Sequence, residues 1–351
     1  MMAELLAYPT VREATLYEKG ADGSVTCSLC ERRCMIPEGW TGFCKTRRNI
    51  GGRLYTLVYG DISAVESRPI EIKPFFHYWP GSHALTFSTW SCNFDCAWCQ
   101  NFHLSKTSPD PSKATFYHPG EIVKLALANG DIGLCASFQE PTLLTEWCLE
   151  VFKQGKAKGI KYCCYVSNGY MTLEALRMLC DAGMDAVKVD VKGDQEGYAN
   201  YCGGPDVNMV WRTIREAKRM GLHVEVVNLV VSGVNDKEEN LKWLVEKHLE
   251  NAGAETPLHF TRYFPAYKFN NPPTKIEILE KACEIARKAG VLYPYIGNVL
   301  GHKYENTYCP ACNELLIRRY GYYVLKYSIT DANKCPRCGV KIPIVGRYIG
   351  G

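Results

Sequence analysis

Short apolar runs alternate with helix-like stretches through the middle of the chain, from about residue 84 to residue 297. The runs have the length and composition of buried parallel strands, and they are Leu85–Trp90, Ile132–Phe138, Lys161–Val166, Ala186–Val191, Val224–Val231, Leu258–Tyr263 and Val291–Ile296. Between them lie helix candidates that include Glu121–Ala128, Leu173–Cys180 and Glu238–His248. This alternation predicts βα units around a parallel sheet that is either closed into a barrel or open.

The helix predicted over Glu238–His248 has a recognisable start. Asp236 is placed as its N-cap, and Glu239 follows three residues later, which matches a capping box. We therefore expect the side chain of Asp236 to cap this helix.

Most of the 18 cysteines fall into three groups that mark the ends and the centre of the chain. The groups are Cys27, Cys30, Cys34 and Cys44; Cys92, Cys96 and Cys99; and Cys309, Cys312, Cys335 and Cys338. The remaining seven are interpreted as small buried apolar side chains, and they are Cys135, Cys148, Cys163, Cys164, Cys180, Cys202 and Cys283. The grouping predicts three domains: a Cys-rich segment at 1–79, an α/β domain at 80–299 and a small C-terminal domain at 300–351.

Composition narrows the class of protein. Apolar residues make up 46% and charged residues 22% of the chain, as in globular proteins with a core. The net charge of +4 comes without a dense Lys/Arg run, which disfavours nucleic-acid and membrane partners. Residues 1–16 lack the pattern of a secretory signal, and no apolar run reaches the roughly 18 to 20 residues of a spanning helix. We therefore predict a cytoplasmic protein, in which reduced cysteines serve metal binding or catalysis.

The central cysteines have the spacing Cys-x3-Cys-x2-Cys at Cys92, Cys96 and Cys99. Three thiolates so spaced can bind three irons of a [4Fe–4S] cluster and leave the fourth iron without a protein ligand. The group follows the predicted strand Leu85–Trp90, at the strand end where active sites of βα barrels gather. The alternative is a zinc site to which His103 contributes the fourth ligand.

Further motifs accompany this spacing along nearly the whole chain. In order they are Tyr59-Gly60, Pro69-Ile70-Glu71, Cys92-Asn93-Phe94-Asp95-Cys96-Ala97-Trp98-Cys99-Gln100-Asn101, Glu140-Pro141-Thr142, Asn168-Gly169, Asp190-Val191-Lys192, Asn235-Asp236, Gly297-Asn298-Val299 and Asn306-Thr307-Tyr308-Cys309-Pro310. With this series the chain resembles radical S-adenosylmethionine (SAM) enzymes of the branch that contains glycyl-radical-enzyme activases, such as pyruvate formate-lyase activating enzymes. Within that branch it most closely resembles the AmmeMemoRadiSam-system radical SAM enzymes.

The resemblance implies a partial or near-complete (β/α) radical SAM barrel and a set of SAM-binding residues at its strand ends. Glu140 is expected to meet the ammonium group of SAM, although its Glu-Pro-Thr motif lacks the paired glycines usual before it; a cap for the following helix is the alternative. Asp190 and Lys192 are expected at the cofactor, with ion pairing inside the sheet as the alternative. The full set of implied cofactor-binding residues is Glu140, Ser167, Asn168, Asp190, Lys192, Asn228, Arg262 and Asn298.

The two outer cysteine groups have different spacings. At the C-terminal end, two Cys-x2-Cys pairs about twenty residues apart predict a zinc ribbon, with short strands at Leu315–Ile317 and Tyr322–Tyr327; a four-cysteine iron–sulfur cluster is the alternative. The N-terminal spacing Cys-x2-Cys-x3-Cys followed by Cys44 fits either zinc or a second iron–sulfur cluster.

The predicted function is reductive cleavage of SAM to a 5′-deoxyadenosyl radical, which abstracts hydrogen from a substrate. The substrate is expected to be a protein or peptide, with a small metabolite or RNA as alternatives, and the electron donor a protein such as flavodoxin or ferredoxin. An iron–sulfur electron carrier or a zinc-ribbon interaction protein is the non-enzyme alternative. Such a protein has no use for three cluster cysteines beside Glu-Pro-Thr and Asn-Gly loops.

Overall fold

The computed structural model describes residues 2–350, which form two compact units. Unit 1 comprises Met1–Ser67, Ala84–Ala186 and Tyr201–Pro205, and unit 2 comprises Arg68–His83, Val187–Asn200 and Asp206–Gly351. Unit 1 contains the N-terminal and central cysteine groups, and unit 2 contains the C-terminal group. The domain boundaries at 1–79, 80–299 and 300–351 stay a prediction.

The main sheet has eight strands in the order β14-β13-β12-β11-β10-β9-β8-β7. They are β7 (Ala64–Pro69), β8 (His83–Ser88), β9 (Gly133–Ala136), β10 (Tyr162–Ser167), β11 (Ala186–Asp190), β12 (His223–Val230), β13 (Leu258–Arg262) and β14 (Pro294–Gly297). The pairs β8–β9, β9–β10, β12–β13 and β13–β14 are parallel. The order follows the chain, as successive βα units require, and each predicted strand corresponds to one of β8 to β14. The predicted α/β class with a mostly parallel sheet is therefore confirmed.

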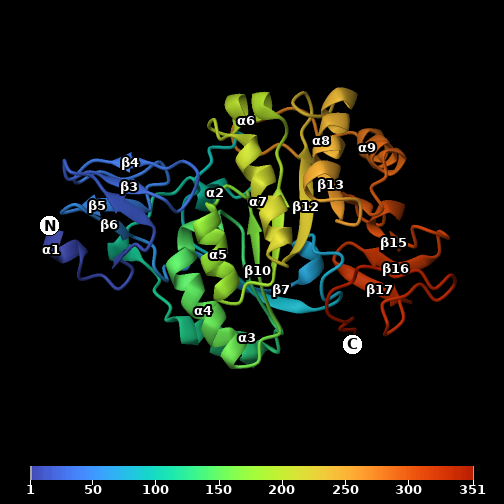
Figure 1. Ribbon diagram of the computed structural model, residues 1–351, viewed down its shortest axis with the longest axis horizontal. Helices are drawn as coiled ribbons and strands as arrows, with labels where there is room; N and C mark the ends of the chain where they lie inside the picture. Colours follow the sequence, from blue (N-terminus) through green and yellow to red (C-terminus); the bar gives the residue numbers. More distant parts are fainter. Residues whose placement is uncertain (1, 351) are drawn as a thin grey trace. The chain divides into compact units, whose positions relative to one another are not determined.

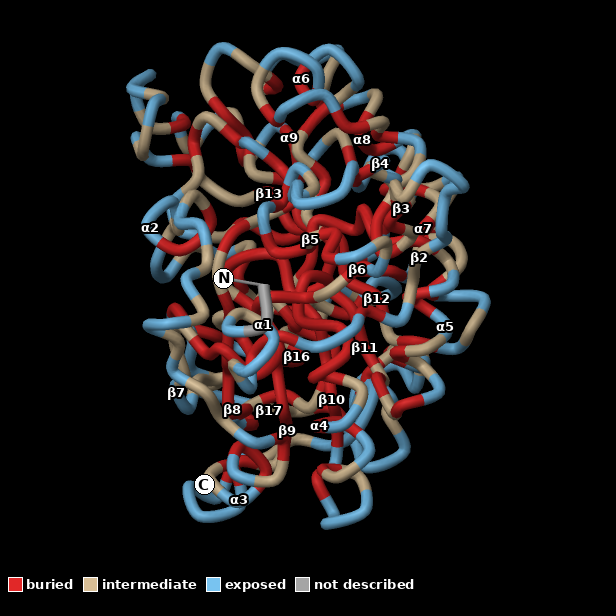
Figure 2. The backbone as a smooth tube through the Cα atoms, turned by 90° about the vertical axis from the view of Figure 1, so that its left-hand side faces the viewer, coloured by how far each residue is buried: buried red, intermediate tan, exposed pale blue. Residues whose placement is uncertain are grey.

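In unit 1, strands β8, β9 and β10 are covered by helices and are almost wholly buried (Figures 1 and 2). The helices are α3 (Pro119–Asn129), α4 (Thr145–Ala157) and α5 (Leu173–Asp181), and α4 packs against both others. Trp147 of α4 is completely buried, with its ring centre 5.2 Å from that of Phe87 in β8. This apolar packing fixes the strand ends from which the central cysteine loop departs.

The N-terminal part of unit 1 consists of two small antiparallel sheets. One has the order β1-β6-β5 and the other β2-β3-β4. Their bounds are β1 (Arg12–Glu13), β2 (Tyr17–Lys19), β3 (Val25–Cys27), β4 (Met35–Ile36), β5 (Arg47–Ile50) and β6 (Arg53–Thr56). Two short helices, α1 (Met2–Leu5) and α2 (Phe102–Ser105), complete this unit.

In unit 2, strands β12, β13 and β14 are accompanied by α6 (Gln195–Tyr201), α7 (Val207–Arg219), α8 (Glu238–Asn251) and α9 (Ile276–Ala289). Helices α8 and α9 lie side by side (Figure 1). A second sheet has the order β15-β16-β17, with β15 (Thr307–Tyr308), β16 (Leu315–Tyr320) and β17 (Tyr323–Tyr327). In the described residues, no helix combines the length and the apolar character needed to cross a membrane.

Helix α8 starts at Glu238, as predicted, but its N-cap differs from the prediction. Its N-cap is Lys237, and no side chain caps it. Oδ1 of Asp236 instead accepts the backbone N–H of Gly233 at 3.0 Å, within the turn that precedes the helix. The predicted capping box at Asp236 is therefore wrong, because a local turn competes for the same carboxylate.

The last predicted strand began too early, because its first apolar residue belongs to a helix cap. Gly290 follows α9 with φ of 106°, and the N–H of Val291 reaches back to the carbonyl of Ala286 at 2.9 Å. Such a left-handed cap satisfies the free carbonyls at a helix end, and the apolar residue after it packs onto the helix. Strand β14 consequently starts at Pro294 rather than at Val291.

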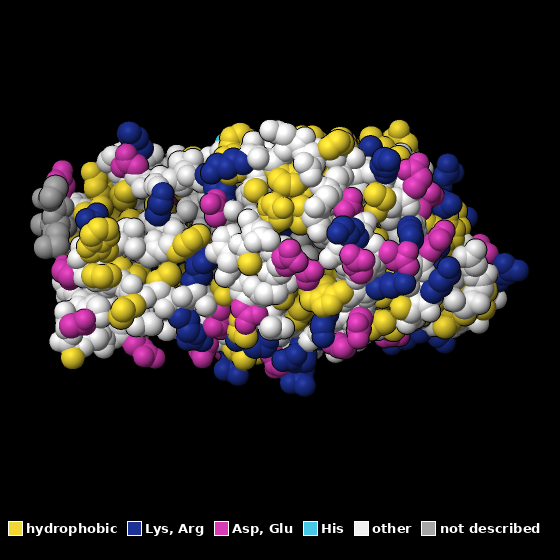
Figure 3. Space-filling view, turned by 90° about the horizontal axis from the view of Figure 1, so that it is seen from above, with side chains coloured by type: hydrophobic (Ala, Val, Ile, Leu, Met, Phe, Trp, Pro, Cys, Tyr) yellow, Lys and Arg dark blue, Asp and Glu magenta, His cyan; other side chains and the backbone are white. Residues whose placement is uncertain are grey.

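Charged side chains on the face shown in Figure 3 are mixed in sign, with Lys and Arg interspersed among Asp and Glu. This mixture accords with the small net charge of +4.

Candidate functional site

The central cysteine loop leaves β8 through a sharp turn at Ser91. Ser91 has φ of 69°, a left-handed conformation that is uncommon for a residue with a side chain. Two hydrogen bonds hold it there: its N–H donates to the carbonyl of Leu104 at 2.9 Å, and its hydroxyl donates to the carbonyl of Cys44 at 2.6 Å. The turn places Cys92 immediately after the carboxyl end of the strand.

The three central sulfur atoms face hydrogen-bond donors and a positive charge. The N–H of Phe94 donates to Cys92 Sγ at 3.3 Å, and Ser105 Oγ lies 3.1 Å from Cys99 Sγ. Lys106 pairs with Asp95 at 2.8 Å. Burial alone would lower the pKa of Lys106, but the hydrogen bond to Asp95 and the electrostatic interaction with the thiols of Cys96 and Cys92 outweigh burial and raise this pKa. Such donors stabilise anionic sulfur.

Burial raises the pKa of the Cys92 thiol, and the nearby Glu140 and Cys96 raise it further. This sulfur therefore becomes a thiolate at neutral pH only where a metal replaces its proton. A cluster iron supplies that positive charge, so the donor set fits an iron–sulfur cluster on three cysteines.

Glu140 lies at the carboxyl end of β9 and joins two loops of the site. It is completely buried, and it caps the short helix η3 (Pro141–Leu144) through the N–H of Thr142 at 3.1 Å. Its carboxylate also accepts the hydroxyl of Ser167 and the N–H of Asn168, both at 2.8 Å. Glu140 therefore caps the short helix η3 and not the longer helix α4 after it, whose N-cap is Leu144. Burial raises the pKa of Glu140, and these donors offset part of that effect.

Asn168 connects Glu140 to the cysteine loop. Its Nδ2 donates to Asn93 Oδ1 at 2.7 Å and lies 3.9 Å from Cys92 Sγ. Its Oδ1 accepts the N–H of Tyr170, which fixes the orientation of the amide. The structure therefore brings three predicted groups together, namely the cysteine loop, Glu140 and the Ser167–Asn168 turn.

Phe138 occupies the position where a glycine is usual in this motif. It has φ of 73°, the left-handed conformation that glycine adopts without strain. The side chain of Asn101, two residues after Cys99, donates to the carbonyl of Phe138. The turn shape is therefore kept without the glycine, and the cysteine loop helps to hold it.

A short segment, 201–205, packs on the cysteine loop and was not predicted. The N–H groups of Asp95 and Ala97 donate to the carbonyls of Cys202 and Tyr201 at 3.0 and 2.9 Å. Gly203 has φ of 80°, and a Cβ on it would lie 3.2 Å from Cβ of Asp95. The paired glycines Gly203-Gly204 were the available signal for this close approach.

Asp190 and Lys192 lie in unit 2, at the end of β11 and just beyond it. Lys188 donates to Asp190 Oδ1 at 2.5 Å, which is the ion pairing considered as the alternative. Burial opposes ionisation of Asp190, but Lys188 and Lys192 outweigh it and lower the pKa. The carboxyl group of Asp190 is therefore a partly exposed anion between two lysines.

The remaining candidates in unit 2 support backbone near their strand ends. Asn228 is buried and donates to the carbonyl of Val191 at 2.9 Å. Arg262 Nε donates to the carbonyl of Thr274 at 2.8 Å, and Asn298 Nδ2 donates to the carbonyl of Arg262 at 3.1 Å. Arg262 and Asn298 are thus neighbours at the ends of β13 and β14.

Comparison with known proteins decides the family. Residues 88–244 match the family model described as the Radical SAM superfamily, and they include the three cysteines, Glu140, Asn168 and Asp190. The chain is 39% identical over 337 residues to Uncharacterized protein MJ0808 of Methanocaldococcus jannaschii, covering 95% of this chain and 100% of the relative. Residues 88–244 form a Radical SAM superfamily domain. Membership supports an enzyme that binds a [4Fe–4S] cluster and SAM.

More distant relatives were also found. GTP 3′,8-cyclase of Mannheimia succiniciproducens is 23% identical over 248 residues, covering 66% of this chain and 73% of the relative. Among solved structures, a domain of pyruvate-formate lyase-activating enzyme from Bacteroides vulgatus is similar with a TM-score of 0.41 and 18% identity, covering 47% of this chain and 99% of that chain. A radical SAM methyltransferase from Sphaerobacter thermophilus is similar with a TM-score of 0.47 and 15% identity, covering 62% of this chain and 67% of that chain.

The C-terminal cysteines lie outside the matched radical SAM domain and form a compact group in unit 2. In the described chain they are the one set of three or more candidate ligands whose ligand atoms all lie within 4.8 Å of one another. Cys309 Sγ lies 3.5 Å from Cys338 Sγ, and Cys312 Sγ lies 3.7 Å from Cys335 Sγ. The predicted strands of this region are present as the antiparallel pair β16 and β17.

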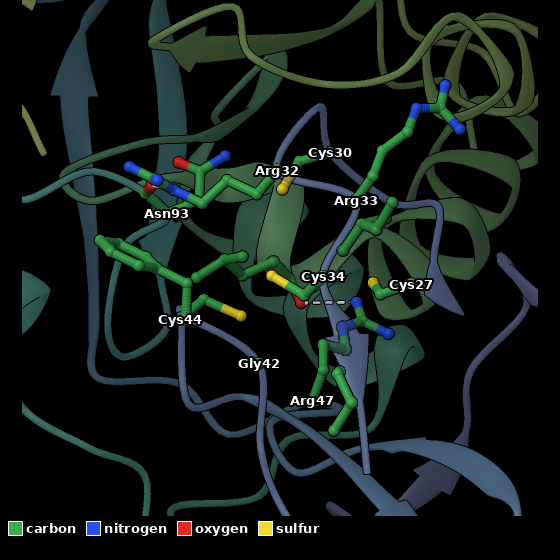
Figure 4. Close-up of a pocket in the computed structure, with 13 residues that line it drawn as sticks. Cys27, Cys30, Arg32, Arg33, Cys34, Gly42, Cys44, Arg47 and Asn93 are labelled. Carbon is green, nitrogen blue, oxygen red and sulfur yellow. Dashed lines mark hydrogen bonds between the residues drawn. The ribbon is translucent and has the colours of Figure 1, made fainter. Parts of the chain in front are cut away.

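The N-terminal cysteines lie outside the radical SAM domain as well, on its N-terminal side in the sequence. They line one small pocket of unit 1 (Figure 4). The pocket is completed by charged and polar side chains and by apolar residues, among them Arg32, Arg47, Asn93, Ile36 and Leu143. Sequence spacing grouped the four cysteines correctly but gave no sign of the arginines around them.

Proposed function

We propose that this protein is a radical SAM enzyme that cleaves SAM reductively and transfers a hydrogen atom from substrate to the resulting radical. When bound, the cluster and SAM supply a 5′-deoxyadenosyl radical and methionine. The observation that carries the proposal is the convergence of Cys92, Asn168 and Glu140 at the ends of β8, β10 and β9 within the radical SAM domain.

The protein's own residues bind and orient the reactants. Cys92, Cys96 and Cys99 would ligate the cluster, while the N–H of Phe94 and the charge of Lys106 stabilise its anionic sulfur atoms. Glu140 holds the turn at Ser167 and Asn168 in place, and the lone pair that remains on its Oε2 would accept the ammonium group of SAM. Asn168 aligns the first cluster ligand through its contacts with Asn93 and Cys92.

The candidate residues of unit 2 are proposed to bind SAM or substrate. Asp190 and Lys192 would bind the ribose and carboxylate groups of SAM, since one is an anion and the other a cation at the same strand end. Asn228 would position their backbone through the carbonyl of Val191. Arg262 and Asn298 would contact cofactor or substrate.

The finer assignment is that of an AmmeMemoRadiSam-system enzyme with an activase-like action on a protein or peptide, reduced by flavodoxin or ferredoxin. The motif series from Tyr59-Gly60 to Cys309-Pro310 supports it. A small-molecule substrate is the second candidate, favoured by the similarity to proteins named GTP 3′,8-cyclase over about two thirds of the chain. The many free cysteines support a reducing, cytoplasmic setting.

A structural zinc ion is proposed for the C-terminal cysteines. A tetrahedron with Zn–S bonds of about 2.3 Å has sulfur–sulfur edges of about 3.8 Å. The distances of 3.5 and 3.7 Å between sulfur atoms match these edges. Four thiolates leave no open position, so this ion would stabilise the fold rather than act in the reaction.

The test is anaerobic turnover. The reconstituted protein is given dithionite and SAM, and 5′-deoxyadenosine is quantified; the proposal expects it from the native chain and not from a Cys96→Ala variant. Cys180→Ala, which changes a half-buried cysteine outside the three groups, is the matched control and should retain the product. Equal product from Cys96→Ala and Cys180→Ala would refute the proposal.

A further inference from the structure

The four N-terminal cysteines surround a common space although they come from separate turns. Cys27 ends β3, Cys30 and Cys34 lie in the turn before β4, and Cys44 precedes β5. All four line the pocket drawn in Figure 4, where their sulfur atoms border its interior. Cys27, Cys30 and Cys44 are buried, so a ligand held there would be shielded from water.

Their spacing differs from that of the C-terminal group. In the described residues, the C-terminal sulfur atoms all fall within 4.8 Å of one another, whereas no three of the N-terminal cysteines do. The central cysteines, Cys92, Cys96 and Cys99, share this wider spacing. A single zinc ion needs sulfur edges of about 3.8 Å, but a cubane of iron and sulfide lies between its thiolates and holds them further apart.

The pocket also carries positive charge aimed at the cysteines. Arg47 is 1% exposed and forms a buried ion pair with Glu146 at 2.6 and 2.7 Å. Its Nε is buried without a hydrogen-bond partner, and its charge acts on Cys27 and Cys44. A buried N–H with no partner is costly unless a ligand accepts it. The sulfur of an anionic cluster is such an acceptor.

One residue, Asn93, belongs both to the lining of this pocket and to the loop of the catalytic cysteines. Asn93 follows Cys92 and lines the pocket, where its amide interacts with the thiol of Cys30. Its Oδ1 accepts from Asn168, and its carbonyl accepts Nε of Arg32 at 2.6 Å. The hydroxyl of Ser91 meanwhile donates to the carbonyl of Cys44. The two cysteine sets are therefore joined through Asn93 on one side and Ser91 on the other.

We propose that Cys27, Cys30, Cys34 and Cys44 hold a second iron–sulfur cluster, with Arg47 as its buried hydrogen-bond donor, and that this cluster carries single electrons to the site at Cys92. A low-potential one-electron donor protein reduces it, and it is reoxidised as the electron passes on. No bond to carbon forms or breaks in this step. The electron-carrying role rests on the proposed function, whereas the identity of the metal does not.

The test is metal analysis of the anaerobically purified full chain and of a Cys92→Ala/Cys96→Ala/Cys99→Ala variant. The variant should retain about four iron and four sulfide per chain, with about one zinc, and should give a cluster EPR signal after dithionite reduction. The native chain should contain about twice that iron. Iron-free variant protein with about two zinc per chain, or with no metal beyond the C-terminal zinc, would overturn the proposal.

A second pair of variants keeps the proposal falsifiable where the triple variant fails to fold. Cys30→Ala/Cys34→Ala should halve the iron of the native chain, and the matched Cys163→Ala/Cys180→Ala variant should leave it unchanged. Unchanged iron in Cys30→Ala/Cys34→Ala would contradict a second cluster. A native chain with about eight iron atoms but without SAM cleavage would count against the proposed function and leave the second cluster standing.

Discussion

Four hydrogen bonds converge on the carboxylate of Glu140, and two of them come from the turn after the next strand. The side chain of Glu140 therefore links the loop after β9 to the turn after β10. Its neighbour in this role, Asn168, reaches the first cluster ligand. The position of the Asn168 amide consequently depends on a residue that is not itself bonded to the cysteines.

Replacing Glu140 by Gln should slow SAM cleavage about ten- to a hundredfold. The amide presents an N–H where the carboxylate accepted one, and a lost hydrogen bond to a charged group amounts to about 1.5–3 kcal/mol. The rate of 5′-deoxyadenosine formation measures this, with iron content as the check that the cluster is intact. Glu150→Gln, which changes an exposed carboxylate of the same unit, is the control. Equal rates in the two variants would contradict the role of Glu140.

His248 gives the fold a pH dependence of known sign. It is completely buried, its Nε2 donates to the carbonyl of Thr256 at 3.0 Å, and burial lowers its pKa from 6.5 to about 3. In the unfolded chain the imidazole of His248 is therefore protonated below pH 6.5, whereas in the folded chain it stays neutral down to about pH 3. Stability from the neutral imidazole is present above pH 6.5 and is lost as the pH falls through this window.

The comparison of native protein with His248→Gln isolates this effect. Between pH 7 and pH 5, the difference in unfolding free energy between the two proteins should shrink by about 2 kcal/mol, because only the native chain loses the contribution of His248. Denaturant unfolding at both pH values measures it. A difference that stays constant between pH 7 and pH 5 would show that His248 is not held neutral.

For single residues, the sequence predicted the candidate ligands better than the side chains that hold them in position. The cysteine spacing located Cys92, Cys96 and Cys99, and strand ends located Glu140 and Asn168. The supports Ser91, Asn101 and Arg47 were missed, because their roles depend on partners that are distant in the sequence or on a positive φ at a residue other than glycine. Such contacts are decided by packing, not by local pattern.

Among elements, the ion pair between Arg47 of β5 and Glu146 of α4 fixes the N-terminal sheet to the helical layer of unit 1. Both side chains are nearly inaccessible, and Arg47 also donates to the carbonyl of Leu143 at 3.0 Å. Coulomb attraction between the partners outweighs burial, so the pKa of Glu146 is lowered. The pair therefore stays ionised inside the unit.

Removing one partner should destabilise the chain far more than removing both. Arg47→Met leaves Glu146 buried without its counter-charge, at a cost of about 3–5 kcal/mol. The double variant Arg47→Met/Glu146→Met removes the uncompensated charge and should recover most of this loss. Chemical denaturation of the three proteins checks it. A double variant that is as unstable as Arg47→Met would contradict the explanation.

Element boundaries were the weaker part of the sequence-based picture. Periodicity found every strand from β8 to β14, because buried parallel strands form continuous apolar runs. The pattern misplaced the start of β14, where a helix cap ends at Gly290, and the N-cap of α8, where the carboxylate of Asp236 holds a turn at Gly233. The segment 201–205 has neither an apolar run nor a helical period and was therefore not found.

For the whole molecule we expect three separate metal sites: a catalytic iron–sulfur cluster, a second iron–sulfur cluster and a structural zinc ion. Cys309 and Cys335 belong to an apolar cluster that includes Phe76, Tyr295 and Leu316, and Cys312 packs against it. Loss of their metal should therefore loosen this part of unit 2 without changing the iron sites. The two proposed iron–sulfur sites lie in unit 1.

Cys312→Ser should lower the zinc content by about one per chain, leave iron unchanged and lower the thermal midpoint. The reason is that a four-thiolate site contributes folding free energy only when all its ligands are present. Elemental analysis and a thermal melt of the same sample measure both effects. Loss of iron rather than zinc in this variant would assign an iron–sulfur cluster to the C-terminal cysteines.

The central claim is that three cysteines leave one iron of the catalytic cluster open to SAM. EPR spectroscopy of the dithionite-reduced protein, recorded with and without SAM, tests it most directly. We predict that SAM shifts the cluster signal in the native chain and in Cys30→Ala/Cys34→Ala, and leaves the residual signal of Cys92→Ala/Cys96→Ala/Cys99→Ala unchanged. A native spectrum that SAM does not alter would contradict it.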